Sequence, residues 1–288
     1  MKKRFIYMIV IIIMTILTTG CSFVKDNLEN AKICTTIYPV QFLTDKLYGE
    51  HSTIESIYPQ GADIDNYRLT SKQIKEYAKN NLFIYNGLTN EKNIAKNLIN
   101  KNKNLLIIDI ANGLNYKYDL KELWMSPYNY LMLAKNIKEG LNDYLKSSII
   151  KKEVNKNYNE LAEKLSLMDA DLRSIAREAN KNNKETLLVT DDLFYYLQDY
   201  GFKIVSLDPD TRTESTINNV NNDLKKKKYN AIIILDNTID DEINNIIDKH
   251  KISQVNISSM IDEPENNDNY INQMQTFIDS IRNLCIKD

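Results

Sequence analysis

The chain has 288 residues, of which 37 are Lys or Arg, 39 are Asp or Glu, two are His and three are Cys. This length suggests about two domains of roughly 150 residues each, and the near balance of charge offers no basic excess for binding nucleic acid. His51 and His250 share no motif, and the cysteines at 21, 34 and 285 have no zinc-finger or CxxC spacing, which argues against a His/Cys metal site and a His-dependent catalytic triad.

The N-terminus is predicted to be an export signal. Three basic residues precede an apolar run of 13 residues, 5–17, which is shorter than the roughly 20 residues that span a membrane. The following Thr18-Thr19-Gly20-Cys21 resembles a bacterial lipoprotein signal, in which cleavage precedes Cys21 and this cysteine carries the lipid. A plain signal peptide or an uncleaved anchor is the alternative. Removal of residues 1–20 changes the formal charge from −2 to −5.

Residues 21–30 are polar and are predicted to be a tether between lipid and domain. An N-terminal lobe is expected over 31–147, because extended apolar runs alternate there with helical stretches. This alternation predicts βαβ units and a mostly parallel sheet. The expected strands are 33–38, 53–58, 82–86 and 104–109, and the expected helices are 40–48, 71–80, 90–101 and 127–145.

One long helix is predicted over 148–182. Apolar residues recur there at spacings of three and four, which places them along one face of a helix of about 30 residues and roughly 45 Å. We expect it to run along both lobes as a spine that permits only small closure movements, with a coiled coil as the alternative. The stripe comprises Ile150, Val154, Tyr158, Leu161, Leu165, Met168, Leu172, Ile175 and Ala179.

A second α/β lobe is expected over 183–288. Its predicted strands are 186–190, 203–207, 230–235 and 253–257, with helices between them and a final helix at 269–285. Another helix, 192–200, should end at Gly201, a residue suited to the left-handed conformation after a helix. The fold class predicted is therefore α/β, with two lobes, each a mostly parallel sheet flanked by helices. Cys34 and Cys285 are expected to be unpaired thiols.

Polar residues follow several of these strands, at the sheet edge where α/β proteins bind ligands. Each also has a structural explanation, since Asp and Ser at strand ends often cap helices or form turns. Asp191 or Asp192, for example, could simply cap the helix that follows. The candidates are Asp63, Asp65, Glu122, Asp191, Asp192, Asp236, Ser258 and Ser259.

Several segments together resemble the bacterial solute-binding lipoproteins of zinc and manganese ABC transporters, solute-binding protein family 9. The resemblance covers nearly all of the mature chain, and the long spine helix is also a family trait. The matching segments are Ile37-Tyr38-Pro39, Ser56-Ile57-Tyr58-Pro59-Gln60-Gly61-Ala62-Asp63, Leu82-Phe83-Ile84-Tyr85-Asn86-Gly87, Trp124-Met125-Ser126-Pro127 and Val189-Thr190-Asp191.

This resemblance implies metal ligands at Asp65, Glu122, Asp191 and Ser259. The chain departs from the family at these positions. Asp65 and Glu122 stand where His is usual, and Asp191 stands where zinc-type members have His and manganese-type members have Glu. The fourth ligand, usually acidic, falls at Ser258 or Ser259.

Carboxylate oxygens suit harder cations than imidazole does, so Mn²⁺ is expected before Zn²⁺. Without a cation, clustered carboxylates should raise the pKa of at least one member. The function implied is a lipid-anchored, extracytoplasmic monomer that delivers a divalent cation to an ABC permease at the cell membrane, without catalysing a reaction. One alternative is a degenerate member without a metal site, acting as an accessory or adhesive lipoprotein. Another is an enzyme that uses Asp65 and Asp191 as a carboxylate pair.

Overall fold

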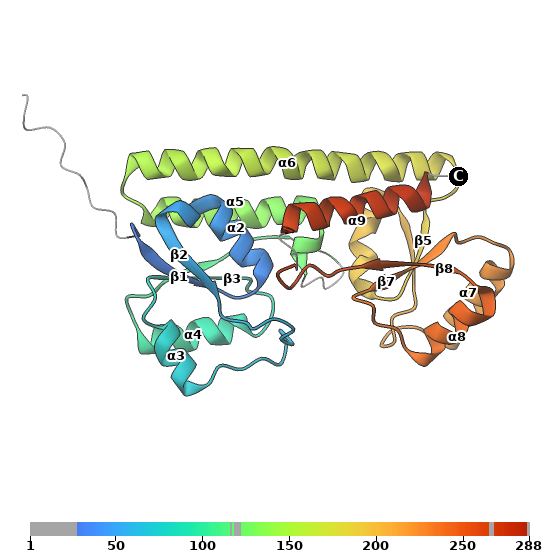
Figure 1. Ribbon diagram of the computed structural model, residues 1–288, viewed down its shortest axis with the longest axis horizontal. Helices are drawn as coiled ribbons and strands as arrows, with labels where there is room; N and C mark the ends of the chain where they lie inside the picture. The colour runs from blue at the N-terminus through green and yellow to red at the C-terminus, as the bar shows by residue number, and fades with distance from the viewer. Residues whose placement is uncertain (1–27, 116, 118–121, 265–267, 287–288) are drawn as a thin grey trace, which may run out of the picture.

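The computed structural model describes residues 28–115, 117, 122–264 and 268–286. The expected signal peptide, Cys21 and residues 22–27 of the tether lie outside the described residues. Two α/β lobes lie side by side along one long helix, α6 (Ser148–Lys181) (Figure 1). Within the described ranges, no helix is both long enough and apolar enough to cross a membrane.

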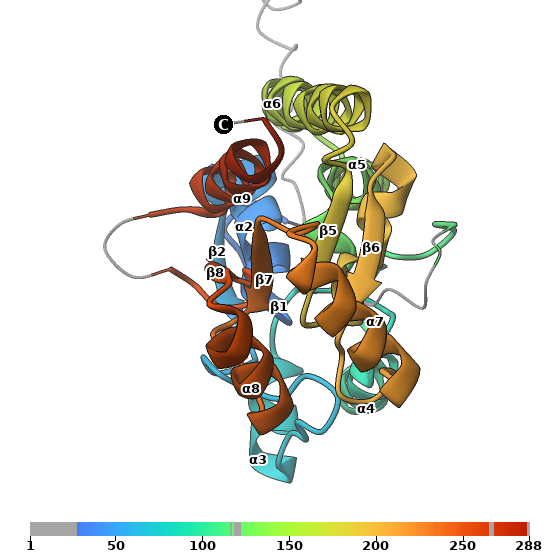
Figure 2. The same cartoon turned by 90° about the vertical axis from the view of Figure 1, so that its right-hand side faces the viewer.

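The N-terminal lobe contains a four-stranded parallel sheet in the order β2-β1-β3-β4. Its helices cover both faces, with α2 and α5 on the side of α6, and α3 and α4 on the opposite side (Figure 2). The strands are β1 (Ala31–Thr35), β2 (Ser52–Ser56), β3 (Leu82–Tyr85) and β4 (Leu106–Asp109). The helices are α2 (Tyr38–Tyr48), α3 (Ser71–Tyr77), α4 (Glu91–Lys101) and α5 (Pro127–Tyr144), with short 3₁₀ helices η1 (Gly49–His51) and η2 (Leu123–Met125).

The C-terminal lobe has the same arrangement, with a parallel sheet in the order β6-β5-β7-β8. The predicted fold class is therefore confirmed. The strands are β5 (Thr186–Val189), β6 (Lys203–Ser206), β7 (Ala231–Leu235) and β8 (Ser253–Ile257). The helices are η3 (Asp192–Tyr200), α7 (Glu214–Lys225), α8 (Asp241–His250) and α9 (Tyr270–Cys285).

Helix starts follow local sequence signals. The hydroxyl of Thr70 accepts the backbone N–H of Gln73 at 3.3 Å, and the Gln73 side chain accepts the Thr70 N–H in return, which makes a capping box before α3. Ser126 caps α5, and Pro127 occupies its first turn, where the missing N–H costs no hydrogen bond. These signals are readable before any tertiary contact is known.

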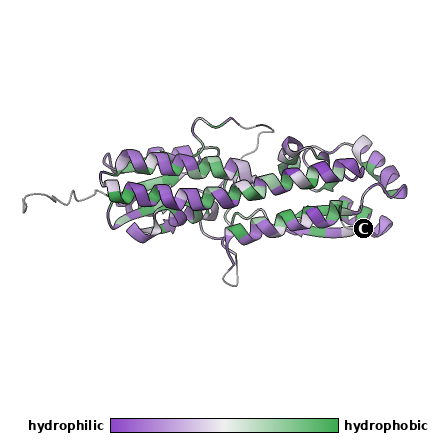
Figure 3. Ribbon diagram, turned by 90° about the horizontal axis from the view of Figure 1, so that it is seen from above, coloured by the Kyte–Doolittle hydropathy of each residue, from purple (hydrophilic) through white to green (hydrophobic). Residues whose placement is uncertain are grey.

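Helix α6 has 34 residues, which corresponds to about 51 Å. Most of the predicted stripe is buried, and Ile150 and Tyr158 at its beginning are half-buried. The stripe packs against α5, α2 and α9 of the same chain, which replaces the coiled-coil alternative with an intramolecular spine. Seen from above, α6 runs along both lobes with many hydrophilic residues on its outer face (Figure 3).

One buried apolar cluster spans both lobes, from Leu28 to Cys285, because α6 and α9 contribute to it along their length. A smaller cluster fills the space beneath α7 and α8. Cys34 and Cys285 are buried free thiols, as expected. Desolvation raises the pKa of Cys34 to about 12 and that of Cys285 to about 11, so both are unreactive at neutral pH.

Two local differences from the sequence prediction have physical causes. The segment 192–200 is a 3₁₀ helix, and its aromatic residues favour the α-helix only weakly. It ends at Gly201 in the left-handed region (φ 107°), as expected. Strand β4 begins at Leu106, two residues later than predicted, because the Asn102 side chain accepts the Asn104 N–H and holds a turn there.

Candidate functional site

Loops that follow the carboxyl ends of strands in both lobes line a cleft between the two lobes. In each lobe the strand order reverses beside the first strand, so the topological switch points lie between β1 and β3 and between β5 and β7. A cavity of about 110 Å³ is lined by residues of both lobes, among them Tyr38, Gln41 and Tyr58 on one side and Ile261, Asp262 and Glu263 on the other.

Asp65 lies in the loop after β2, on a turn built by Asp63. One carboxylate oxygen of Asp63 accepts the backbone N–H groups of Asp65 at 3.0 Å and Asn66 at 3.1 Å, and its other oxygen accepts the Asn66 amide at 2.8 Å. These hydrogen bonds lower the pKa of Asp63, led by those from Asn66. Asp65 itself is exposed to solvent. Asp63 therefore has a structural role, and the turn presents Asp65 at the surface.

The same loop is tied to the other lobe at Gly61. Its N–H donates to Asp262 Oδ1 at 2.9 Å, across 201 positions of sequence. Gly61 has φ +72°, a conformation that glycine adopts without the penalty of a Cβ. Sequence reasoning missed Asp262 as a contact, because no local pattern connects it with Gly61.

The segment 122–126 is held against the C-terminal lobe through Trp124. The buried indole N–H of Trp124 donates to the Ser259 carbonyl at 2.8 Å, and the Trp124 carbonyl accepts the hydroxyl of Tyr270 in α9. Glu122 is half-buried and directly precedes η2. The second and fourth predicted ligand motifs are therefore brought together in space.

Ser259 is buried, and both its backbone N–H and its backbone carbonyl form hydrogen bonds. Its N–H donates to Asp236 Oδ1 at 2.8 Å, while its carbonyl binds Trp124. The Ser258 hydroxyl accepts the N–H of Met260 at 3.0 Å. Asp236 therefore shapes the loop after β8 from the neighbouring strand end.

Asp191 lies at the end of β5 and caps η3. Its Oδ1 accepts the Leu193 N–H at 2.7 Å, which is the capping role that the sequence allowed. Burial raises the pKa of Asp191, and the Leu193 N–H opposes this shift. The carboxylates of Asp208, Asp192 and Asp236 raise the pKa further. The edge of this sheet is therefore acidic, as a cation site would require.

Asp65, Glu122 and Asp191 do not form a ready metal centre in this conformation. Among residues 28–115, 117, 122–264 and 268–286, no group of three or more His, Cys, Asp or Glu side chains is placed to hold a metal ion. The reason is that Asp65 stands on an exposed turn of one lobe, whereas Asp191 caps η3 in the other. Both histidines are engaged elsewhere, His51 with Glu153 at 3.0 Å and His250 with Asn221 at 2.8 Å.

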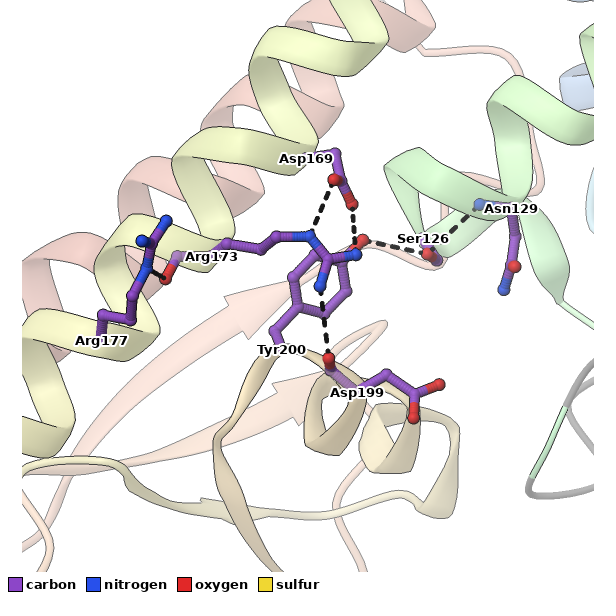
Figure 4. Close-up of polar contacts among 7 residues, drawn as sticks. All are labelled: Ser126, Asn129, Asp169, Arg173, Arg177, Asp199 and Tyr200. Carbon is purple, nitrogen blue, oxygen red and sulfur yellow. Dashed lines mark hydrogen bonds and ion pairs between the residues drawn. The ribbon is translucent and has the colours of Figure 1, made fainter.

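A second set of polar contacts joins the spine to both lobes (Figure 4). The Arg173 guanidinium of α6 lies over the Tyr200 ring at 4.8 Å and makes two hydrogen bonds to Asp169, at 2.9 and 3.2 Å. The Tyr200 and Ser126 hydroxyl oxygens are 3.2 Å apart, so the N-cap of α5 contacts η3. These contacts connect α6 to η3 and η3 to α5. The sequence analysis did not predict them.

The chain is similar in sequence to known metal-binding proteins over most of its length. The family model described as ZnuA, zinc-uptake complex component A, periplasmic, matches residues 33–284. The iron-binding protein YfeA of Yersinia pestis is 28% identical over 197 residues, which span 64% of this chain and 61% of that protein. The manganese ABC transporter substrate-binding lipoprotein PsaA of Streptococcus pneumoniae is 22% identical over 284 residues, 89% of each chain.

Solved structures share the fold. The metal-dependent lipoprotein YcdH of Bacillus subtilis superposes with a TM-score of 0.75 at 17% identity, covering 89% of this chain and 99% of that one. The Zn(II)-bound ZnuA-like domain of AdcA from Streptococcus pneumoniae superposes with a TM-score of 0.72 at 20% identity, with the same coverage. At these identities the likeness concerns the fold alone.

Proposed function

The chain belongs to the ZnuA family of metal ABC transporter substrate-binding proteins, and we propose that it captures a divalent cation between its two lobes and delivers it to a membrane permease. The observation that carries this proposal is the match of family and fold over nearly the whole chain, together with an interlobe cavity lined by residues of both lobes. Members of the family are transport components, and we propose the same non-enzymatic role here.

The proposed ligands are Asp65, Glu122, Asp191 and Ser259. Oxygen donors of this kind favour Mn²⁺ over Zn²⁺, whereas relatives are named for manganese, zinc and iron. The acidic surroundings that raise the pKa of Asp191 support a cation at this edge, because a positive ion would relieve the repulsion between neighbouring carboxylates. Binding of one ion by all of the proposed ligands would require these side chains to lie closer together than they do in this conformation.

Titration calorimetry of the mature protein with Mn²⁺, Zn²⁺, Ca²⁺ and Mg²⁺ tests this proposal. We expect Mn²⁺ to bind most tightly, and Asp65→Asn or Asp191→Asn to weaken binding by about tenfold or more, about 1.4 kcal/mol each. Asp248→Asn is a matched control, since that carboxylate is 83% exposed on α8. Absence of heat with all four cations at micromolar concentrations would refute cation capture.

A member of the fold that has lost its metal site is the second candidate. It is favoured by the lack of a preformed group of three His, Cys, Asp or Glu side chains in the described ranges. The capping hydrogen bond of Asp191 also gives that carboxylate a role without a metal. Such a protein would be an accessory or adhesive lipoprotein. The same titration separates the candidates, and neighbouring genes for an ATPase and a permease would support transport.

Attachment to the outer face of the cell membrane through lipidated Cys21 is part of the proposal. Relatives named as lipoproteins support it, two of them as substrate-binding lipoproteins of ABC transporters. Metabolic labelling with palmitate should mark the native chain and not Cys21→Ala. Equal labelling of both would exclude this anchor. A single copy, without nucleic acid, is expected to dock on the permease.

A further inference from the structure

A buried carboxyl group lies at the switch point of the N-terminal lobe. Glu91 is the first residue of α4 and is only 1% exposed. None of the residues that the structure describes forms an ion pair with it. Its Oε2 atom is buried and makes no hydrogen bond of good geometry. An ionised carboxylate in such a position carries a large desolvation cost.

Three hydroxyl groups accompany this carboxyl, and their oxygens are also buried without a hydrogen-bond partner in the described part of the chain. Thr36 follows β1, Tyr58 follows β2, and Thr89 follows β3. Both Thr36 and Tyr58 interact electrostatically with Glu91, and Thr89 with Tyr58. The Thr36 hydroxyl therefore lies beside the acid, while the Tyr58 hydroxyl, with Thr89 next to it, also faces the acid.

The groups that face Glu91 do not offset the desolvation of its charge. Burial raises the pKa of Glu91 well above its usual value, and Asp109 at the end of β4 raises it further. The Thr36 hydroxyl and the Asn86 backbone oppose this shift without cancelling it. Lys92 approaches Asp109 at 3.9 Å rather than Glu91.

The phenols facing Glu91 cannot supply a counter-charge, because a tyrosine side chain is either neutral or negatively charged. Desolvation raises the pKa of Tyr58 and Tyr85, that of Tyr85 to about 12, so both rings remain neutral. Arg68, the cation that acts on Tyr58, is exposed and donates to the carbonyls of Asp65 and Tyr67. A proton is therefore the remaining way to remove the charge of Glu91.

We propose that Glu91 is a positioning residue of the cleft, held as a neutral carboxylic acid whose single O–H donates to one neighbouring hydroxyl oxygen, that of Thr36. A neutral acid converts an unpaired acceptor into a donor and gives the Thr36 hydroxyl a partner. The proton is bound at Oε2 and no covalent bond between heavy atoms changes.

The connection from Glu91 to Asp65 runs through Tyr67. The Tyr58 and Tyr67 rings meet edge to face at 4.9 Å between centroids. The neighbour of Glu91, Asn90, donates its amide to the Tyr67 carbonyl at 3.4 Å. Asp65 lies two residues before Tyr67, so Tyr58 and the start of α4 hold one end of the turn that presents Asp65. The prediction for cation binding rests on the proposed function, whereas the protonation state does not.

Stability against pH tests the protonation state. The folded-state pKa of Glu91 lies above the unfolded value, so its contribution is complete below the ordinary Glu pKa and is lost as pH rises toward the folded-state pKa. The folding equilibrium constant of the native chain should then fall by up to tenfold per pH unit relative to Glu91→Gln, which stays neutral. We expect similar stability near about pH 4.5 and a more stable variant above about pH 7.

Glu185→Gln is the matched control. Glu185 is also buried, but its Oε1 contacts Lys203 Nζ at 2.6 Å, and this lysine lowers its pKa. The dependence of stability on pH is therefore opposite to that of Glu91, since the contribution of Glu185 is present above the ordinary Glu pKa and is lost at lower pH. Glu185→Gln should reduce stability at neutral pH. A Glu91→Gln variant that behaves in the same way would overturn the proposal.

Infrared difference spectra give a direct measurement. The native chain at neutral pH should show a protonated-carboxyl C=O band that Glu91→Gln lacks, and an ionised Glu91 at that pH would refute the proposal. In cation titrations, the affinity of the native chain should fall at high pH more than that of the variant, and equal pH profiles would refute the positioning role. If the native chain binds no cation, the proposed function fails while the infrared result still decides the protonation state.

Discussion

Replacing Trp124 with Phe should loosen the contact between the segment 122–126 and the C-terminal lobe. The change removes the indole N–H that donates to the Ser259 carbonyl at 2.8 Å. An unsatisfied buried carbonyl costs about 1–3 kcal/mol. Trp124 is only 1% exposed, and the smaller ring removes apolar contact worth about 1–2 kcal/mol. The free energy of unfolding should therefore fall by about 2–5 kcal/mol.

Thermal unfolding followed by circular dichroism can measure this loss. For a chain of this size, the expected fall in Tm is roughly 5–15 °C. Tyr128→Phe is the control, since Tyr128 is 51% exposed and its change should stay within about 0.5 kcal/mol.

A double-mutant cycle with Tyr270→Phe tests whether the two hydrogen bonds act together. Tyr270 donates to the Trp124 carbonyl, so the two substitutions should couple by about 0.5 kcal/mol or more. Strict additivity, or a Tm change for Trp124→Phe no larger than that of Tyr128→Phe, would contradict the reasoning.

Further substitutions probe the packing of the lobes, the contact between them and the charges. Gly140→Ala places a Cβ about 2.8 Å from the Ile108 side chain and should cost about 1–3 kcal/mol of stability in a denaturant titration; no change would mean that Ile108 moves freely. Asp262→Ala removes the acceptor of the Gly61 N–H. It should weaken cation binding and lower stability by about 1 kcal/mol or less. Unchanged cation affinity in calorimetry would show that this contact does not contribute to binding. The effect of Glu185→Gln on stability should shrink as pH falls below the ordinary Glu pKa and through the lowered folded-state pKa, as denaturant midpoints at acidic and neutral pH can show.

The architecture could be predicted because its signals are local. Apolar spacing of three and four residues marked α6 to within one residue of each end, and alternation of strand and helix marked both parallel sheets. The capping role of Asp191 was also open to sequence reasoning, since Asp before a helical segment commonly accepts a backbone N–H. The main differences from the prediction are shifted boundaries and the 3₁₀ form of 192–200.

The candidate site was predicted less completely. The motif around Trp124 was identified as a unit, but its hydrogen bond to Ser259 crosses 135 positions of sequence. The contact between Gly61 and Asp262 crosses 201. No periodicity connects residues so far apart, because their proximity depends on how two separate sheets are mounted on one helix. The relation of Asp65 to Asp191 is likewise a matter of lobe placement and loop conformation.

By itself, the sequence determined two α/β lobes, their spine and the oxygen-bearing residues at the positions where the resemblance implies metal ligands. Those features depend on residue type and on spacing within a few turns or strands. The tertiary structure alone decided that Glu91, an ordinary helix-start residue in sequence, is buried and has no counter-ion among the residues that the structure describes. Burial removes water from the carboxyl group, and whether water is removed depends on the elements packed around it rather than on its neighbours in the chain.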